Sequence, residues 1–416
     1  MARFVKCRAD VDRLTSGEAH NRDVERLRGP AFVLVTALWL TGCSAQSPSA
    51  ASPVSPSASA TSNTGTPTPS PTGCTQEQAI AGWPVRQLAM QVLVAPAQFS
   101  DVAASNAVVA HGIGGLILFG ATPAPDFTTS LERMTSSAPR GIPPLVMTDE
   151  EGGAVQRAQD IVGPVPSARR MARTMTPAQI ESLAYDVGGK LRAAGITMDL
   201  APVLDLDNRP GPSSTNPDGT RSFGMDIART SAAGIAFAKG LQRAGVIPVV
   251  KHFPGLGHAT GNTDNGPAQT VPWDTLASNG LVPFRAAVRA GIPAVMVANA
   301  SVPGLTTQPA SISPTVINQV LRDSLQFTGL VMTDSVSAHA LSDDGYPVPA
   351  AAVAALTAGA DLVLFGTGQN DDPRLAGGTA TAIVKAVRSG ALSRARLEAA
   401  VAHVLAVKDV DLCGSS

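Results

Sequence analysis

Residues 246–264 read VIPVVKHFPGLGHATGNTD, and this stretch is the most informative one in the chain. Its first five residues form an apolar run bounded by turn signals, which is typical of a buried strand. The run ends in Lys251 and His252, and a glycine-rich turn then leads to His258 and Asp264. Polar side chains at the end of a buried strand are costly unless a pocket uses them. A surface loop is the simpler alternative, and a phosphate-binding loop is excluded because no Gly-Lys-Ser/Thr sequence closes it.

Similar apolar runs recur along the chain, and longer alanine-rich stretches with helical spacing separate them. We expect strands over residues 88–94, 115–119, 145–148, 197–203, 246–250, 294–297, 330–333 and 362–365. Eight alternations of strand and helix predict an α/β fold, a parallel (β/α)8 TIM-type barrel that forms a single catalytic domain. An open, doubly wound sheet is the alternative.

Polar side chains follow five of these runs at the point where each run ends. They are Asp149 after the third run, Asp205 and Asp207 after the fourth, Lys251 and His252 after the fifth, Asn299 after the sixth, and Asp334 after the seventh. The C-terminal ends of barrel strands converge on one mouth, where active sites are built. The sequence therefore predicts an active site at this mouth.

The N-terminal region has the pattern of an export signal. Arg26 and Arg28 precede an apolar run over residues 31–40, which is too short to span a bilayer but fits the hydrophobic region of a signal peptide. The small residues before Cys43 resemble the lipobox of bacterial lipoproteins, in which the cysteine is lipidated. We therefore expect a lipoprotein-type signal peptide over residues 1–42, with an ordinary cleaved signal as the alternative. The mature protein is then expected at the outer face of the bacterial cell membrane, held by its lipid.

The rest of the chain divides into a tether and a folded domain. Residues 43–73 are rich in Ser, Pro, Thr and Ala and carry no charge, so we expect a disordered linker. Residues 74–416 remain for the catalytic barrel and are sufficient for a large core. The formal net charge is -1 without any basic block, so nucleic acid is not an expected partner. Cys74 and Cys413 bracket this domain; we expect a disulfide between them in an oxidising compartment, with two free thiols as the alternative.

Five ordered motifs resemble glycoside hydrolase family 3 over residues 85–410. They are TDEEGGAVQR (148–157), APVLD (201–205), RSF (221–223), KHFPG (251–255) and VMTD (331–334). The resemblance is greatest to the single-domain β-N-acetylglucosaminidases of this family, which act on peptidoglycan fragments. It implies a carbohydrate substrate and no metal or organic cofactor, and we expect a monomer.

The resemblance also implies roles for individual residues. Asp334 matches the catalytic nucleophile, since a carboxylate at a strand end can attack an anomeric carbon and form a glycosyl-enzyme intermediate. A structural cap of the following turn is the alternative. Sugar binding is implied for Asp149, Arg157, Arg221, Lys251 and His252, with salt bridges in the barrel mouth as the alternative. Asp205 is expected to have a structural role, and Glu150 and Glu151 to form an acidic pair at a helix N-terminus.

Retaining hydrolysis needs a second group, which protonates the leaving oxygen and then activates water. The resemblance implies an Asp-Ser-His sequence in the loop after KHFPG, with the histidine as the acid/base. In this chain no histidine follows Asp264 at that spacing, and Gly266 replaces it if the loop carries a two-residue insertion. Counted without gaps, Asp264 itself occupies the position of the histidine. We expect Asp264 and His258 to provide the acid/base, in an order that the sequence leaves open.

Together these features predict an exo-acting, retaining β-N-acetylglucosaminidase that removes terminal N-acetylglucosamine from peptidoglycan-derived fragments in cell-wall turnover. A phosphorylase is an alternative if a histidine is the acid/base, because a neutral histidine repels phosphate less than a carboxylate does. A β-glucosidase of the same family is a further alternative, although many such relatives carry a second domain that this chain is too short to hold. Outside the enzymes, the alternative is a sugar-binding lipoprotein.

Overall fold

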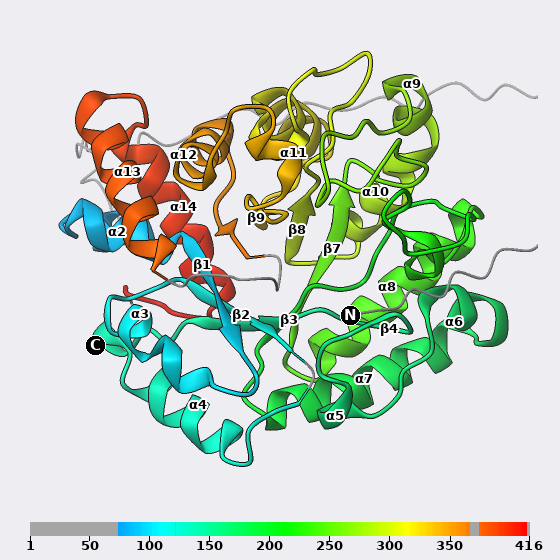
Figure 1. Cartoon of the computed structure of the whole chain (residues 1–416), viewed down its shortest axis with the longest axis horizontal. Helices are drawn as coiled ribbons and strands as arrows, with labels where there is room; N and C mark the ends of the chain where they lie inside the picture. Colours follow the sequence, from blue (N-terminus) through cyan, green and yellow to red (C-terminus); the bar gives the residue numbers. More distant parts are fainter. Residues whose placement is uncertain (1–73, 121, 367–373, 414–416) are drawn as a thin grey trace, which may run out of the picture. The chain divides into compact units, whose positions relative to one another are not determined.

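The computed structural model describes residues 74–120, 122–366 and 374–413 (Figure 1). The predicted signal peptide over residues 1–42, the predicted lipidation site Cys43 and the linker up to residue 73 lie outside these ranges. No helix within the described ranges is long and apolar enough to cross a membrane.

Eight parallel strands form a nearly closed barrel in the order β10-β1-β2-β3-β6-β7-β8-β9. Their bounds are β1 Leu93–Gln98, β2 Gly115–Phe119, β3 Leu145–Thr148, β6 Met198–Asp199, β7 Ile247–Phe253, β8 Ala294–Val297, β9 Leu330–Thr333 and β10 Val363–Leu364. A bridge between Met332 and Leu362 joins the two ends of the sheet. A separate hairpin consists of β4 Glu150–Gly152 and β5 Val155–Gln156. The predicted (β/α)8 barrel is confirmed, and the open sheet is excluded.

Helices surround the strands (Figure 1). The α-helices are α1 Gln76–Ile80, α2 Val85–Gln91, α3 Asn106–Ala110, α4 Phe127–Ser136, α5 Gln159–Val162, α6 Ala168–Thr174, α7 Pro177–Ala193, α8 Ile227–Arg243, α9 Trp273–Thr275, α10 Leu281–Arg289, α11 His339–Ser342, α12 Val348–Ala358, α13 Leu375–Ser389 and α14 Arg394–Val407. Local signals set the start of the long ones. The Thr176 side chain accepts from the Gln179 amide before α7, and the Asp226 side chain accepts from the Arg229 amide before α8.

The predicted and observed strands agree closely for much of the barrel and differ near its start, and the strand predicted over residues 197–203 is observed only as the shorter β6, Met198–Asp199. β2, β3, β8 and β9 have the predicted bounds. The predicted strand over residues 88–94 is wrong, because residues 85–91 form α2 and β1 begins at Leu93. Side chains of both elements are buried, so the apolar run continues across their junction and its pattern does not locate the boundary. β7 extends to Phe253, which places Lys251 and His252 within the strand.

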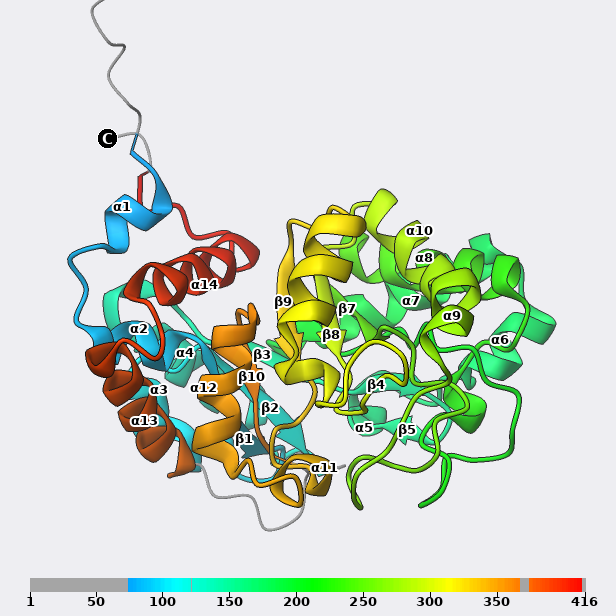
Figure 2. The same cartoon turned by 90° about the horizontal axis from the view of Figure 1, so that it is seen from above.

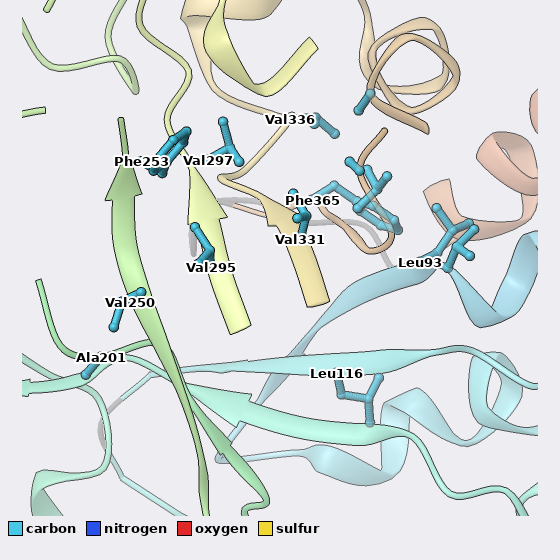
Figure 3. Packing of buried hydrophobic residues seen from close by; sticks show 14 of the residues in the cluster. Leu93, Leu116, Ala201, Val250, Phe253, Val295, Val297, Val331, Val336 and Phe365 are labelled. Atoms are coloured by element: carbon cyan, nitrogen blue, oxygen red, sulfur yellow. The ribbon is translucent and has the colours of Figure 1, made fainter. Parts of the chain in front are cut away.

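The hydrophobic core has two layers, because successive side chains of a strand point to opposite faces. One layer fills the barrel and includes Ile117, Met147, Met198, Met296 and Met332. The other layer contains the strand residues Leu116, Val250, Val295 and Val331 with Phe365 (Figure 3). Since the barrel is filled by packed side chains, the residues at its mouth stand on a rigid base.

The two ends of the described domain are joined covalently. Cys74 and Cys413 form a disulfide with their Cα atoms 5.6 Å apart, although 339 residues separate them in sequence. The first and last helices, α1 and α14, lie next to each other (Figure 2), and Gln76 Nε2 donates to Val410 O at 2.5 Å. The disulfide therefore closes the barrel domain at its termini.

Reduction of this disulfide is expected to lower the free energy of unfolding by about 2–5 kcal/mol, because the cross-link restricts a long loop of the unfolded chain. Urea unfolding with and without reductant measures the change. A Cys74→Ser/Cys413→Ser double variant is the control, since reductant should leave its unfolding unchanged. Equal midpoints for the oxidised and reduced wild-type protein would contradict the prediction.

Candidate active site

A cavity of about 240 Å³ opens at the C-terminal ends of the barrel strands. Its lining comes from strands β2, β7, β8 and β10 and from the segments that follow β3, β6, β7, β9 and β10. Its charged and titratable lining consists of Asp149, Arg157, Arg221, Lys251, His252, Asp264 and Asp334. Seven of the eight side chains that the sequence assigned to catalysis or sugar binding therefore share one cavity, and His258 does not line it.

Lys251 lies at the centre of a buried ion-pair network. Its ammonium group is 2.6 Å from Asp149 Oδ1 and 2.6 Å from Glu151 Oε1, and its side chain is only 2% exposed. Glu151 in turn accepts two hydrogen bonds from Arg221, at 2.7 Å from Nε and 2.8 Å from the second terminal nitrogen. Burial alone would raise the pKa of Glu151, but Arg221 and Lys251 hold it well below its usual value. Both cations are thus fixed at one side of the cavity.

The expected helix-terminal position of Glu150 and Glu151 is wrong. Both residues belong to β4, and the positive φ angles of Gly152 and Gly153 turn the chain back into β5. Glu151 contacts the cavity cations, whereas Glu150 is bound by the Ala158 amide at 2.7 Å and by Gln156 Nε2 at 2.7 Å. Burial raises the pKa of Glu150 to about 7. The hairpin therefore places Glu151 next to two cations and Glu150 next to neutral hydrogen-bond donors.

Replacing Glu151 by glutamine is expected to lower the free energy of unfolding by about 3–5 kcal/mol, because two buried cations lose their shared counter-ion. Chemical denaturation measures the change. Glu181→Gln is the matched control: the Glu181–Arg243 pair has the same 2.7 Å separation but is exposed, so we expect a loss of less than about 1 kcal/mol. Equal effects of the two substitutions would show that the network adds nothing to stability.

His252 is held by Asp205 behind the cavity wall. The imidazole Nδ1 is 2.6 Å from Asp205 Oδ2, and the Asp205 carboxylate also accepts from the backbone amides of His252 and Leu256. Burial and the nearby Arg221 charge lower the pKa of His252 to about 4, so the ring is neutral near pH 7. Asp205 therefore has the structural role expected from the sequence: it orients His252.

Asp334 follows β9 directly and is partly accessible from the cavity. Its Oδ1 accepts from the Ser335 amide at 2.7 Å, so the carboxylate caps the next turn as well as lining the cavity. Asn299, which follows β8, donates to Ser335 O at 2.7 Å and fixes the same turn. Burial raises the pKa of Asp334, and the carboxylate of Asp264 adds to this effect. The sequence indicated Asn299 only as a polar group at a strand end; its function here is to support the Asp334 turn.

Asp264 enters the cavity from the loop after β7. The loop is attached to the residues that follow Asp334, because Ala340 N donates to Thr263 O at 3.0 Å and His339 N donates to Asp264 O at 3.4 Å. Although the Asp264 side chain is accessible to solvent, partial desolvation by the surrounding protein raises the pKa of its carboxyl, and the Arg221 charge opposes this shift. A carboxyl with a raised pKa is suited to donate a proton to a leaving group.

His258 does not line this cavity, so the structure does not bring it together with the other residues expected to act in catalysis. Its side chain lines a different cavity together with Leu206 and Leu276. The backbone explains the placement: His258 N donates to Asp207 Oδ2 at 3.1 Å, and Gly257 packs so tightly that a Cβ there would lie 2.0 Å from Leu206 O.

Arg157 also lines the cavity. Its guanidinium lies 6.0 Å from the centre of the Phe119 ring, and its amide donates to Asp149 O at 3.1 Å.

The only three described residues that bring potential metal-ligating atoms within 4.8 Å of one another are Asp205, Asp218 and His252, all buried. Glu151 and Asp218 are the members of this region whose importance the sequence did not indicate.

Three comparisons place this geometry among known proteins. The sequence profile of the glycosyl hydrolase family 3 N-terminal domain matches residues 85–407. The β-hexosaminidase LpqI of Mycobacterium tuberculosis is 37% identical over 316 residues, which is 74% of this chain and 79% of that protein. The solved structure of M. tuberculosis LpqI matches with a TM-score of 0.73 at 34% identity and covers 82% of this chain and 98% of that one. A glycoside hydrolase family 3 β-N-acetylglucosaminidase from Paenibacillus has a TM-score of 0.71 at 30% identity, over 78% of this chain and 62% of that one.

Proposed function

The chain belongs to glycosyl hydrolase family 3, and on that premise we propose that it is an exo-acting, retaining β-N-acetylglucosaminidase. One observation carries the proposal. The carboxylates of Asp334 and Asp264 line the same cavity at the barrel mouth as the buried network of Lys251, Arg221 and Asp149. Two carboxylates around one anomeric centre are the groups that retaining hydrolysis requires, and the network supplies fixed donors and an acceptor for sugar hydroxyls.

In the first step the Asp334 carboxylate attacks the anomeric carbon and forms an ester bond to it, while the bond from that carbon to the leaving oxygen breaks. Asp264 gives its proton to this oxygen. In the second step the Asp264 carboxylate takes a proton from water, and the resulting hydroxide attacks the anomeric carbon. The ester bond breaks, Asp334 is released as a carboxylate, and the sugar leaves with its original anomeric configuration.

The remaining polar groups bind the non-reducing sugar. Asp149 accepts hydrogen bonds from adjacent hydroxyls, while Lys251 and Arg221 donate to the same ring. Because Glu151 and Asp149 together balance the charges of these two cations, the cations bind a neutral sugar without a need for a charged substrate. The substrates that we propose are peptidoglycan-derived fragments with a terminal N-acetylglucosamine.

Water rather than phosphate is the proposed acceptor. We assign the acid/base role to Asp264, because Asp264 lines the active-site cavity whereas His258 lines another cavity. After the first step Asp264 is an anion, so it repels phosphate and still activates a neutral water molecule. A phosphorylase would need a neutral base at this position.

The experiment is turnover of a chromogenic N-acetyl-β-glucosaminide with and without inorganic phosphate, followed by proton NMR. We expect free N-acetylglucosamine whose first-formed anomer is β, at a rate that phosphate does not change. A sugar 1-phosphate as product would assign the chain to the phosphorylases. Faster turnover of the matching β-glucoside would overturn the proposed specificity.

For cellular location we propose export and anchoring through a lipid on Cys43. The motif before Cys43 supports the anchor, and the Cys74–Cys413 disulfide is typical of an oxidising compartment outside the cytoplasm. Mass spectrometry of the mature N-terminal peptide tests it: an unmodified Cys43, or a mature protein that begins elsewhere, would refute the anchor.

A further inference from the structure

Asp218 is a completely buried carboxyl group that the mechanism above does not use. It precedes the short turn Gly219–Arg221, and its exposed fraction is 0%. No N–H or hydroxyl donor of the described residues reaches either of its carboxyl oxygens. An ionised carboxylate in this state would be very costly, because neither water nor a donor replaces its lost solvation.

The cations near Asp218 are bound to other groups. The Arg221 guanidinium contacts Glu151 at 2.7 and 2.8 Å and Pro217 O at 2.9 Å. Arg209 contacts Asp207 at 2.9 Å. No described cation is therefore left to form an ion pair with Asp218 itself.

Asp205 and His252 lie next to Asp218. One ligand atom from each of Asp205, Asp218 and His252 lies within 4.8 Å of the other two. Burial raises the pKa of Asp205 to about 7, and the hydrogen bonds that its carboxylate accepts oppose this shift: one from the Leu256 amide at 2.6 Å, one from His252 Nδ1 at 2.6 Å, and one from Asp218. Two buried carboxylates at this separation do not both ionise without a proton or a cation between them.

We propose that Asp218 is a neutral carboxylic acid that donates its proton to Asp205, and that this pair fixes His252 as the neutral tautomer with Nε2 free of a proton. The role in sugar binding rests on the proposed function, because it is there that His252 contacts the substrate. Asp218 is a positioning residue in this arrangement, acting on the cavity through Asp205 and His252.

Several observations agree with this assignment. Burial, together with the Asp205 charge, raises the pKa of Asp218 well above its usual value. Nδ1 of His252 faces an acceptor, the Asp205 carboxylate, and therefore carries the proton. Nε2 is 3.4 Å from an Arg221 nitrogen, which is only a donor. If Asp218 were ionised beside Asp205, the two anions would favour a protonated His252. The Nε2–H of that imidazolium would then face the Arg221 guanidinium, which carries the same charge.

The alternative is a divalent cation held by Asp205, Asp218 and His252. It is disfavoured because the Asp205 oxygens already accept three N–H groups and His252 Nδ1 is one of those donors. A cation would have to displace these contacts.

The test compares Asp218→Asn with Asp218→Ala. Asparagine is neutral, has nearly the same shape and offers an N–H where the acid offers its O–H, so kcat and KM should stay within about 3-fold of wild type. Alanine removes the donor and leaves a buried acceptor unpaired, so kcat/KM should fall by about 10–100-fold, mainly through KM. Equal losses in both variants would overturn the proposal. Asp207→Asn is the matched control, because Asp207 is a carboxylate that forms an ion pair with Arg209. We expect this substitution to lower the unfolding midpoint of the protein.

Two measurements do not depend on activity. Infrared difference spectra of wild type against Asp218→Asn should contain the carbonyl band of one buried protonated carboxylic acid, and the absence of this band would overturn the proposal even if the enzyme is active. Equilibrium dialysis against Zn²⁺ alone should show no tight site that Asp218→Asn removes. A 1:1 site lost in that variant would assign the three residues to a cation. If no N-acetylglucosaminide is cleaved but the band is present, the proposed function fails and the protonated pair stands.

Discussion

Replacing Asp334 by asparagine is expected to lower kcat/KM for N-acetylglucosaminides by at least about 10⁴-fold, because the amide does not form the glycosyl ester. Asparagine keeps the oxygen that accepts from the Ser335 amide at 2.7 Å, so the turn after β9 should persist. Steady-state kinetics with a chromogenic substrate measures the loss. The unfolding midpoint should change little, and this separates the loss of the nucleophile from a loss of structure.

Asp334→Ala is the companion variant. It removes the cap as well as the nucleophile, so it should be as inactive as asparagine and less stable by about 0.5–2 kcal/mol. Near-wild-type activity of either variant would mean that Asp334 is only a structural cap, the alternative that the sequence left open.

Replacing Asp264 by asparagine is expected to reduce kcat about 10²–10⁴-fold on substrates with a poor leaving group, such as a disaccharide, because the leaving oxygen is no longer protonated. With an activated aryl leaving group the first step needs little acid, so the loss should be much smaller there. Azide should then accelerate release of the glycosyl-enzyme as a β-glycosyl azide, because it attacks without a general base. His258→Gln is the matched control and should leave both rates unchanged, since His258 lines a different cavity.

The pH dependence follows from the same two groups. Asp334 reacts as the anion, so kcat/KM falls as the pH drops through its pKa, which burial raises above the usual value. Asp264 reacts as the acid, so kcat/KM falls as the pH rises through its pKa, which is also raised. In Asp264→Asn the alkaline loss should disappear and the acid loss should remain. Retention of the alkaline limb would assign the acid to another group.

The sequence predicted the barrel and most of the cavity for a simple physical reason. Each polar group follows a buried apolar run, and the C-terminal ends of parallel strands meet at one mouth. Asp149, Lys251 and Asp334 could therefore be placed from the strands alone. The error at β1 arose because apolar side chains are buried in both α2 and β1. The spacing of apolar residues therefore does not show where the helix ends and the strand begins.

The features that were missed depend on loop paths. Gly152 and Gly153 turn the Glu150–Glu151 pair into a hairpin, and only there do the two carboxylates point to different partners. The orientation of His258 is set by tight packing of Gly257 on Leu206, a contact between loops that are distant in sequence. The geometry of a site that depends on such contacts cannot be predicted from the order of its residues.

Asp218 is a different case. In the sequence Asn216-Pro217-Asp218-Gly219 it has the composition of an exposed turn, for which a solvated carboxylate would be expected. The fold instead buries this turn against Asp205 and His252. Tertiary structure thus changes an ordinary turn residue into a group that has to hold a proton.

The most direct test of the central claim is to identify the residue that becomes glycosylated. A 5-fluoro N-acetylglucosaminyl fluoride slows both steps through its ring fluorine, while its good leaving group lets the intermediate accumulate. After brief incubation, proteolysis and mass spectrometry should find one equivalent of the fluorosugar on the peptide that contains residues 331–334, bound to Asp334. A label on any other residue, or continued turnover without a covalent adduct, would contradict the proposed mechanism.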